Sequence, residues 1–109
     1  MRSVYFVLIF TAQISFAANE TSIDSHGVIL LYHHVAIDSP PSTSISPEDF
    51  RGHLDYLRDN DFSVIPLDQL IEGLKNKEIL PDKAVAITFD DGYISIYQTA
   101  FPMLQSYGF

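Results

Sequence analysis

The segment AVAITFDDGY, residues 84–93, carries the strongest signal for the fold of this protein. Residues 84–89 predict an apolar β-strand, because β-branched and aromatic side chains are enriched in strands. Asp90, Asp91 and Gly92 follow at once, and Asp-Gly is typical of a turn, so the chain is expected to leave the strand sharply. The residues on either side of this segment indicate what kind of sheet the strand belongs to.

Strand and helix patterns alternate along the rest of the chain. Residues 28–32 are apolar without alternation, as expected of a parallel strand covered on both faces. Ser46 predicts a helix N-cap with Pro47 in the first turn. The other expected elements are a Ser- and Pro-rich loop at 36–47, the end of that helix near Asp59 or Asn60, a short strand at 62–65, and a helix face at Leu67, Leu70, Ile71 and Leu74.

A final helix face is expected at Tyr97, Ala100, Phe101 and Leu104. Within it, Pro102 starts a new turn or kinks the helix, because proline has no backbone N–H to donate. Gly108 is expected to stop the helix. The aromatic side chains of this region are expected in the core rather than on a platform for substrate, namely Tyr97, Phe101 and Tyr107.

The repeated order of strand and helix predicts an α/β fold with right-handed crossovers and a parallel sheet. Such a sheet is either open or part of a (β/α) barrel. Three strands cannot close a barrel, so in the barrel case this chain is the amino-terminal part of one.

Composition narrows the classes of function. The chain of 109 residues has 47% apolar residues, so disorder is not expected. A formal net charge of -8 argues against nucleic acid or an anionic membrane surface as the main partner. There is no cysteine, which excludes disulfides, Cys-ligated zinc, iron–sulfur clusters and thiol nucleophiles. Any metal site must therefore use Asp, Glu or His.

Residues 1–17, MRSVYFVLIFTAQISFA, have the pattern of a secretory signal peptide. One positive charge at Arg2 precedes an apolar run at 4–10, which is far shorter than the ~20 residues that span a bilayer. Cleavage between Ala17 and Ala18 is therefore favoured over a membrane anchor. The mature protein is expected to be exported to the periplasm, the cell envelope or the medium, without a stable membrane span.

The candidate chemistry lies at the carboxyl ends of the strands, where parallel α/β folds bind their ligands. Asp90 and Asp91 follow one strand, and Tyr32, His33 and His34 end another. Adjacent carboxylates repel each other, a cost that a cation or hydrogen bonds usually offset. One aspartate could then hold a metal while the other stays free as a base. The alternative is a purely structural turn or helix cap.

Strand alternation lets one of the two histidines face this site. We favour His33, because it continues the strand that Tyr32 leads. The alternative is that both histidines have structural roles.

Residues 84–93 resemble the first signature of the polysaccharide deacetylases, the NodB homology domain of carbohydrate esterase family 4. The resemblance continues through Leu31–Val35, Phe50, Leu54, Leu57, Phe62 and Leu67, and downstream through Tyr97, Ala100, Pro102, Leu104, Gly108 and Phe109. The Tyr-His pair and the long Ser/Pro loop are similar to the exported poly-N-acetylglucosamine deacetylase branch. The resemblance implies the amino-terminal portion of a distorted (β/α) barrel, incomplete in this chain.

On this basis the chain divides into a signal peptide at 1–17, a polar leader at 18–27 and a partial deacetylase domain at 28–109 that is truncated at its carboxyl end. The resemblance implies that Asp90 is the general base and that Asp91 is a ligand to a divalent metal, zinc or another first-row ion. It implies two further histidine ligands and a histidine acid that this sequence does not contain. His33 is the candidate for contact with the substrate or with the groups around it.

The implied activity is metal-dependent removal of N-acetyl groups from an amino-sugar polysaccharide, with an N-acetylated glycan as partner and the fragment inactive alone. One alternative is a non-catalytic exported α/β fragment or weak glycan-binding remnant. Another is a glycosidase that uses both aspartates. Adjacent residues suit that reaction poorly, because its two carboxyl groups stand ~5 Å or more apart.

Overall fold

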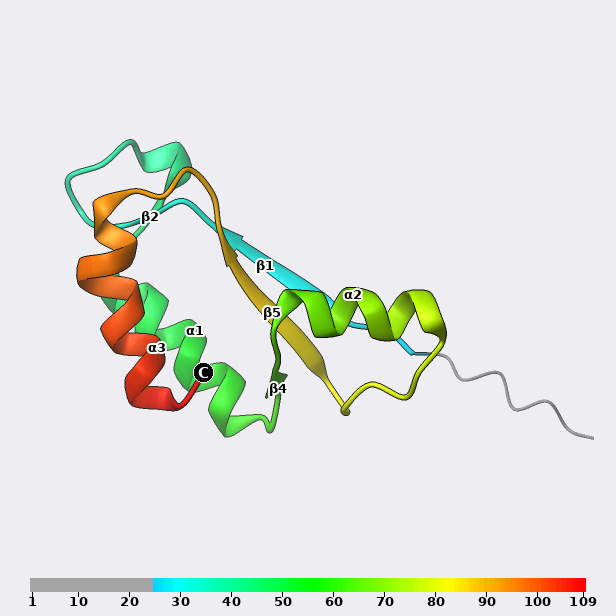
Figure 1. Ribbon diagram of the computed structural model, residues 1–109. Coiled ribbons are helices and arrows are strands. Elements are labelled where there is room, and N and C mark those ends of the chain that lie inside the picture. Colours follow the sequence, from blue (N-terminus) through cyan, green and yellow to red (C-terminus); the bar gives the residue numbers. More distant parts are fainter. Residues whose placement is uncertain (1–24) are drawn as a thin grey trace, which may run out of the picture.

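The computed structural model describes residues 25–109, so the expected signal peptide lies outside the described residues. Its main sheet has three strands, β1 (Val28–Tyr32), β4 (Ser63–Val64) and β5 (Ala84–Phe89), shown in Figure 1. The strand order is β1-β5-β4, so β5, the last of these three along the chain, lies between the other two. Both pairings are parallel. The predicted parallel α/β sheet is therefore confirmed.

The pairing of β5 with β1 is the longer of the two. It runs in register from Val28 opposite Val85 to Tyr32 opposite Phe89. The pairing with β4 extends over two residues. β1 and β5 therefore end at the same edge of the sheet, and this places their carboxyl ends side by side.

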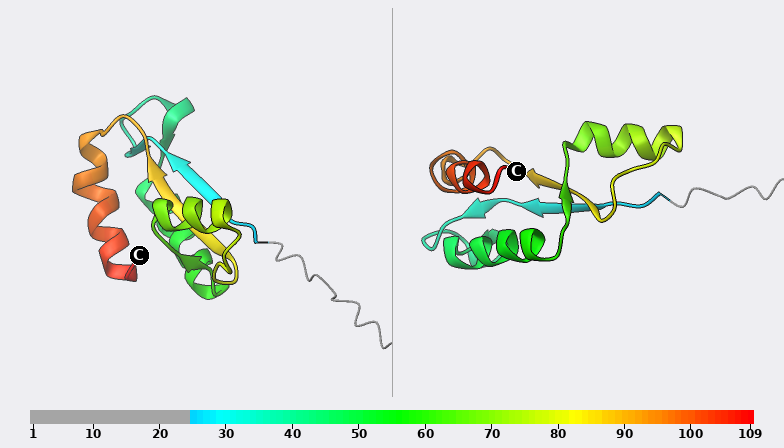
Figure 2. Two further views of the ribbon diagram at one scale, coloured as in Figure 1. Left: turned by 45° about the vertical axis from the view of Figure 1, so that its right-hand side comes forward. Right: turned by 90° about the horizontal axis from the view of Figure 1, so that it is seen from below.

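Within residues 25–109, three α-helices accompany the sheet: α1 (Pro47–Asp59), α2 (Leu67–Asn76) and α3 (Phe101–Tyr107). α1 and α2 lie on opposite faces of the sheet (Figure 2). α1 begins as the sequence predicts, because the Ser46 side chain accepts a hydrogen bond from the Asp49 N–H and Pro47 stands in the first turn. None of the described helices is long and apolar enough to cross a membrane.

Two clusters of buried side chains form the core. The larger joins α1 to the final helical segment through Val35, Phe50, Leu54, Ala100 and Met103. The smaller joins α2 to the other face of β5 through Leu70, Ala84 and Ala86. β5 therefore contributes to the packing on both of its faces.

The prediction that residues 28–32 are covered on both faces is wrong for the described residues. Val28, Ile29 and Leu31 are 47%, 49% and 55% exposed, whereas Val85 and Ala86 in β5 are fully buried. The exposure of β1 follows from the order of the strands in the sheet. β5 takes the central position and leaves β1 at the edge of the sheet.

The Ser- and Pro-rich loop at 36–47 has more structure than its sequence indicates. It contains a 3₁₀ turn, η1 (Pro41–Thr43), and a short strand, β3 (Ser44–Ile45). β3 pairs in parallel with β2 (His34–Val35), which directly follows the main strand β1. β2 and β3 lie in or beside a Ser- and Pro-rich stretch that has no apolar run or periodicity, so the sequence pattern does not indicate them.

The last helical segment changes its geometry where proline enters it. A π-helical turn, η2 (Ile96–Ala100), precedes α3, and the Phe101 N–H bonds to the Ile96 carbonyl five residues earlier. Pro102 occupies the first turn of α3, so it starts a new turn as expected. Gly108 ends the helix with a φ of 73°. The prediction that Tyr97 and Phe101 are core residues is wrong.

Tyr97 is 73% exposed and Phe101 is 49% exposed, and their rings stack on each other. Four residues apart on one helix, they share its outer side, while Ala100 and Met103 fill the core. Tyr107 is half-buried, and its hydroxyl donates a 2.6 Å hydrogen bond to Asp55.

Candidate functional site

Parallel pairing of β1 with β5 assembles the candidate site. The Asp90 N–H donates a 2.9 Å hydrogen bond to the Tyr32 carbonyl, which continues the ladder past the end of β5. The His33 Nε2 atom consequently lies 3.8 Å from the Asp90 Oδ2 atom. The Asp90 side chain is 55% exposed and that of His33 is 29% exposed. The sequence places two groups of polar residues at the ends of separate strands. In the structure, these groups meet at the carboxyl end of the sheet.

Asp91 and Gly92 form the sharp turn after β5. Both have left-handed backbone angles, with φ of 66° and 61° respectively. Glycine adopts this region freely, whereas a side chain makes it less favourable, and aspartate is among the residues that tolerate it best. The Asp91 side chain is exposed and the sequence-predicted turn is present. Backbone strain of this kind is often found at functional sites.

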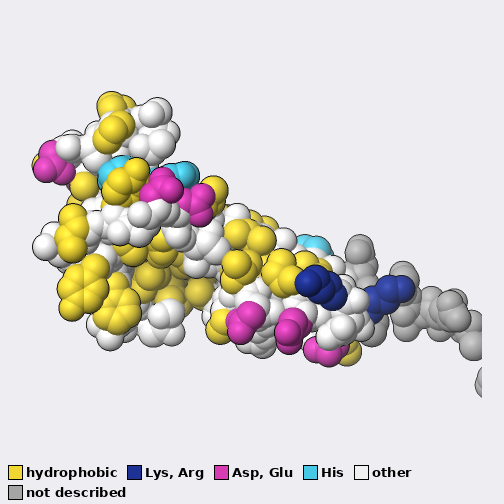
Figure 3. All heavy atoms as spheres, turned by 45° about the horizontal axis from the view of Figure 1, so that its top comes forward, with side chains coloured by type: hydrophobic (Ala, Val, Ile, Leu, Met, Phe, Trp, Pro, Cys, Tyr) yellow, Lys and Arg dark blue, Asp and Glu magenta, His cyan; other side chains and the backbone are white. Residues whose placement is uncertain are grey.

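The segment after the turn packs against β2. The His34 and Tyr93 rings stack with their centroids 3.5 Å apart, and the Ser95 hydroxyl accepts a 3.3 Å hydrogen bond from the Val35 N–H. His34 therefore has an aromatic partner, and His33 is the histidine that faces Asp90. Sequence analysis did not single out Tyr93 or Ser95, although their position directly after the Asp-Asp-Gly turn is a signal that could have found them. His and acidic side chains gather next to each other on this end of the molecule (Figure 3).

Two cavities adjoin β1. The smaller, of about 330 Å³, is lined by Leu31, Tyr32, His33, His34, Ser42, Thr43, Ser44 and Ile45. It lies beside the candidate site and has polar side chains, so it is the one suited to a polar ligand. The β2–β3 pairing holds the loop that forms its wall.

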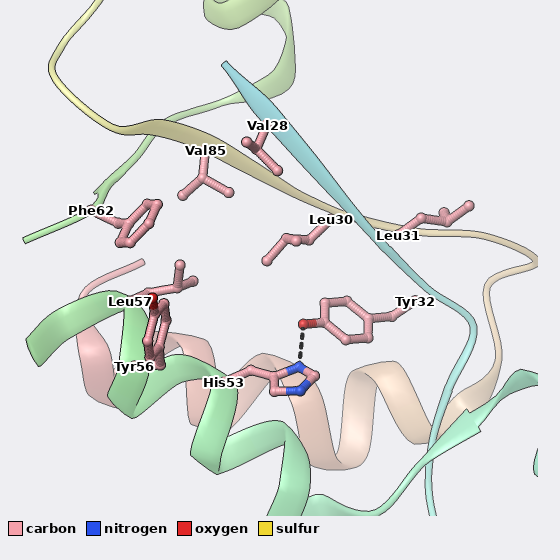
Figure 4. A pocket seen from close by; sticks show the side chains of 9 residues that line it. All are labelled: Val28, Leu30, Leu31, Tyr32, His53, Tyr56, Leu57, Phe62 and Val85. Atoms are coloured by element: carbon pink, nitrogen blue, oxygen red, sulfur yellow. Dashed lines mark hydrogen bonds between the residues drawn. The ribbon is translucent and has the colours of Figure 1, made fainter. Parts of the chain in front are cut away.

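The larger cavity, of about 520 Å³, lies between β1 and α1 (Figure 4). Its lining is almost wholly apolar and includes neither aspartate of the site: Val28, Leu30, Leu31, Tyr32, His53, Tyr56, Leu57, Phe62 and Val85. The Tyr32 hydroxyl lies 2.8 Å from the His53 Nδ1 atom at one end of it. Burial raises the pKa of Tyr32 above its ordinary value. Size alone therefore does not mark this cavity as the site of the chemistry.

The donor groups of the described residues decide whether the chain can hold a metal ion by itself. Residues 25–109 contain no group of three or more His, Asp or Glu side chains placed to hold one ion together. Catalytic zinc sites in proteins use three protein ligands. Asp91 can supply one carboxylate, but the described residues do not form a complete metal site by themselves.

The fold and the site together define a class: a parallel α/β protein with a carboxylate–histidine pair at the carboxyl edge of its sheet. Comparison with curated proteins gives the relatives within this class. The chain is 36% identical over 80 residues to YxkH of Bacillus subtilis strain 168, whose name assigns it provisionally to the polysaccharide deacetylases. It is 33% identical over 82 residues to the poly-β-1,6-N-acetyl-D-glucosamine N-deacetylase of Escherichia coli K12. Each match covers 73% of this chain.

Among solved structures, IcaB from Ammonifex degensii is similar with a TM-score of 0.66 and 38% identity. That match covers 73% of this chain and 34% of IcaB. No protein-family model matches the chain. The chain is thus related in sequence and in fold to the polysaccharide deacetylases. It spans 28% and 12% of the lengths of the two curated relatives, so it corresponds to part of such a protein.

Proposed function

We propose that this chain is the part of a polysaccharide deacetylase that carries the catalytic base. The reaction would be hydrolysis of the acetamide of an N-acetylated amino-sugar polymer, which releases acetate and leaves a free amine. The observation that carries the proposal is the approach of His33 to Asp90, with 3.8 Å between Nε2 and Oδ2, at the shared end of β1 and β5. Relatives named for this reaction support it.

Asp90 is assigned the role of general base. Its carboxylate is 55% exposed, so water reaches it, and it would take the proton of the water that attacks the acetamide carbon. The imidazole of His33 faces the same space. An imidazole can donate or accept a hydrogen bond, so His33 is assigned contact with the substrate or with the groups around it.

Asp91 is assigned as one ligand of a divalent cation, zinc or another first-row ion, because a carboxylate on an exposed turn beside the base is a suitable donor. The remaining ligands would have to come from outside residues 25–109, since these residues hold no further cluster of donors. The 109-residue chain alone is accordingly proposed to be inactive.

A chimera tests this assignment. In it, the present chain replaces the matching residues of YxkH, and acetate release from N-acetylglucosamine oligomers is measured together with bound metal. We expect Asp90→Asn to keep its metal and to lose about 100-fold or more of its turnover, the contribution typical of a general base. Asp91→Ala should lose the metal. Asp82→Asn and Asp82→Ala, at an exposed turn before β5, are the matched controls and should change neither quantity.

Equal metal loss in the Asp90 and Asp91 variants would show that the division of roles is wrong. Shortened glycan chains without acetate would favour the glycosidase alternative. Acetate release by the 109-residue chain alone would show that the described residues suffice for activity.

A further inference from the structure

The loop between β2 and β3 lies beyond the carboxyl end of β1 and is held by hydrogen bonds (Figure 1). The Ala36 N–H donates a 3.0 Å hydrogen bond to the Ile45 carbonyl, which continues the pairing of β2 with β3. The Ser44 hydroxyl donates a 2.7 Å hydrogen bond to the Pro40 carbonyl and lies 2.6 Å from the Ser39 hydroxyl. Because the loop is already ordered, a ligand that binds to it pays little conformational entropy.

This loop and the end of β1 enclose the polar cavity of about 330 Å³. Its lining combines the hydroxyl groups of Ser42 and Thr43 with the apolar side chains of Leu31 and Ile45. A sugar ring has the same combination, because its hydroxyl groups lie around the edge and its C–H groups on the faces. None of the described residues that line the cavity is Lys, Arg, Asp or Glu, so a neutral ligand suits it better than an ion. The volume is at the small end of the range for ligand sites, about 300–1,000 Å³, which favours a single sugar.

Ser42 presents a hydroxyl group to such a ligand. It lies in η1 and is exposed, and its hydroxyl makes no hydrogen bond to any residue among 25–109. The Ser39 and Ser44 hydroxyls differ from it, because they bond to each other. A serine hydroxyl can both donate and accept a hydrogen bond. Ser42 can therefore bond to a sugar hydroxyl in either direction.

His33 connects this cavity to the candidate site. Its side chain lines the cavity, and its Nε2 atom lies 3.8 Å from the Asp90 Oδ2 atom. Neither Asp90 nor Asp91 is among the lining residues, so the cavity lies beside the reacting position and does not include it. A sugar in the cavity would consequently be the neighbour of a sugar whose acetamide lies at Asp90.

We propose that this cavity binds the sugar adjacent to the one that is deacetylated, and that Ser42 determines specificity by contact with the hydroxyl groups of that sugar. The inference rests on the proposed function and adds the form of its substrate. A chain of sugars gains the contact with the loop, whereas a single amino sugar at Asp90 does not. The loop should therefore make the domain prefer oligomers to N-acetylglucosamine itself.

Substrate preference in the YxkH chimera described above tests the role of Ser42. The measured quantity is the ratio of kcat/KM for the N-acetylglucosamine tetramer to kcat/KM for the monosaccharide. Ser42→Phe should lower this ratio at least about 10-fold, because the aromatic ring takes the space of the adjacent sugar. Ser42→Ala should lower it about 3-fold or more, the loss of one hydrogen bond between neutral groups.

The same two substitutions at Ser106 are the matched controls. Ser106 is exposed on α3 and does not line the cavity, so its variants should leave the ratio unchanged. A substitution that only damages the fold slows both substrates alike. An unchanged ratio in Ser42→Phe would therefore overturn the proposal.

Binding is measured separately from activity, by titration with the tetramer and observation of backbone amide signals by NMR. The titration uses the full 109-residue chain and the chimera with Asp90→Asn, in which the base is absent. We expect the signals of Ser42, Thr43 and Ile45 to shift, and the shifts to disappear in Ser42→Phe. Shifts that spare these residues in both proteins would contradict the proposal. A chimera that releases no acetate from either substrate would count against the proposed function instead, and the titration would then decide the present inference by itself.

Discussion

Asp91 and Gly92 show how two neighbouring residues shape the end of a strand. Both occupy the left-handed region of the backbone map, and together they take the chain out of β5 immediately after Asp90. The Asp-Gly pattern predicts this turn from the sequence, because both residue types are enriched in turns. It does not predict that Asp91 itself takes a positive φ.

Two glycine substitutions with opposite expected signs test the backbone argument. Gly92→Ala should lower the free energy of unfolding by about 1–2 kcal/mol, because an L-residue is unfavourable at a φ of 61°. A Cβ atom there meets no other atom within 4 Å, so the cost is conformational and not steric. Thermal or denaturant unfolding measures the change.

Gly52 is the matched control. It lies inside α1, and an added Cβ atom meets nothing within 4 Å there either. Gly52→Ala should therefore raise the free energy of unfolding by about 0.5–1 kcal/mol, the difference in helix propensity. A loss of stability in both variants would contradict the argument from φ.

At the scale of elements, α1 illustrates a helix whose limits follow from local chemistry. Ser46 caps it, Glu48 and Asp49 place negative charge in its first turn, and it ends at Asp59 with Asn60 as C-cap. The sequence predicts the Ser46 cap and the end of the helix near Asp59 or Asn60, because both depend on residues within one turn of the helix end. The inward face of Phe50, Leu54 and Leu57 is buried as the helical spacing requires.

Removal of the Ser46 cap should lower the free energy of unfolding. Ser46→Ala deletes the oxygen that accepts the Asp49 N–H at 3.0 Å, and we expect about 1 kcal/mol lower free energy of unfolding. Ser46→Thr keeps a hydroxyl at the cap and should stay within a few tenths of a kcal/mol of the parent protein. Denaturant unfolding of the three proteins measures both effects. If alanine and threonine cost the same, the hydroxyl is not what stabilises this helix end.

At the scale of the whole molecule, the described residues form two small clusters on opposite faces of a three-stranded sheet. Large apolar side chains of β1 and of the last helical segment stay exposed around them. This arrangement agrees with the relatives, of which the chain covers a minor share. A small core with an open strand edge is expected to be marginally stable.

Export is a prediction for the whole chain that rests on residues 1–17, outside the described part of the structure. Their short apolar run after Arg2 predicts cleavage by a signal peptidase. Amino-terminal sequencing of protein recovered outside the cytoplasm should therefore begin at Ala18. Protein that is held in the membrane and still begins at Met1 would contradict cleavage.

The class of fold and the position of most elements can be predicted from the sequence. Strands at 28–32 and 84–89 have the predicted bounds, α1 begins and ends where its caps indicate, and Gly108 stops the last helix. Each of these features depends on side chains within a few residues, through hydrogen bonds and apolar spacing that a linear pattern records. The resemblance carried by residues 84–93 is likewise local, and the relatives agree with it.

The identity of neighbouring strands and of the covered apolar faces, in contrast, depends on tertiary packing. β5 lies between β1 and β4, which leaves β1 at an edge, and Tyr97 and Phe101 face outward. The same pairing brings His33 to Asp90, residues that are far apart in the chain. Neither result is recorded in a local pattern. Strand order depends on how surfaces distant in sequence bury one another, and a residue's neighbours along the chain do not contain that information.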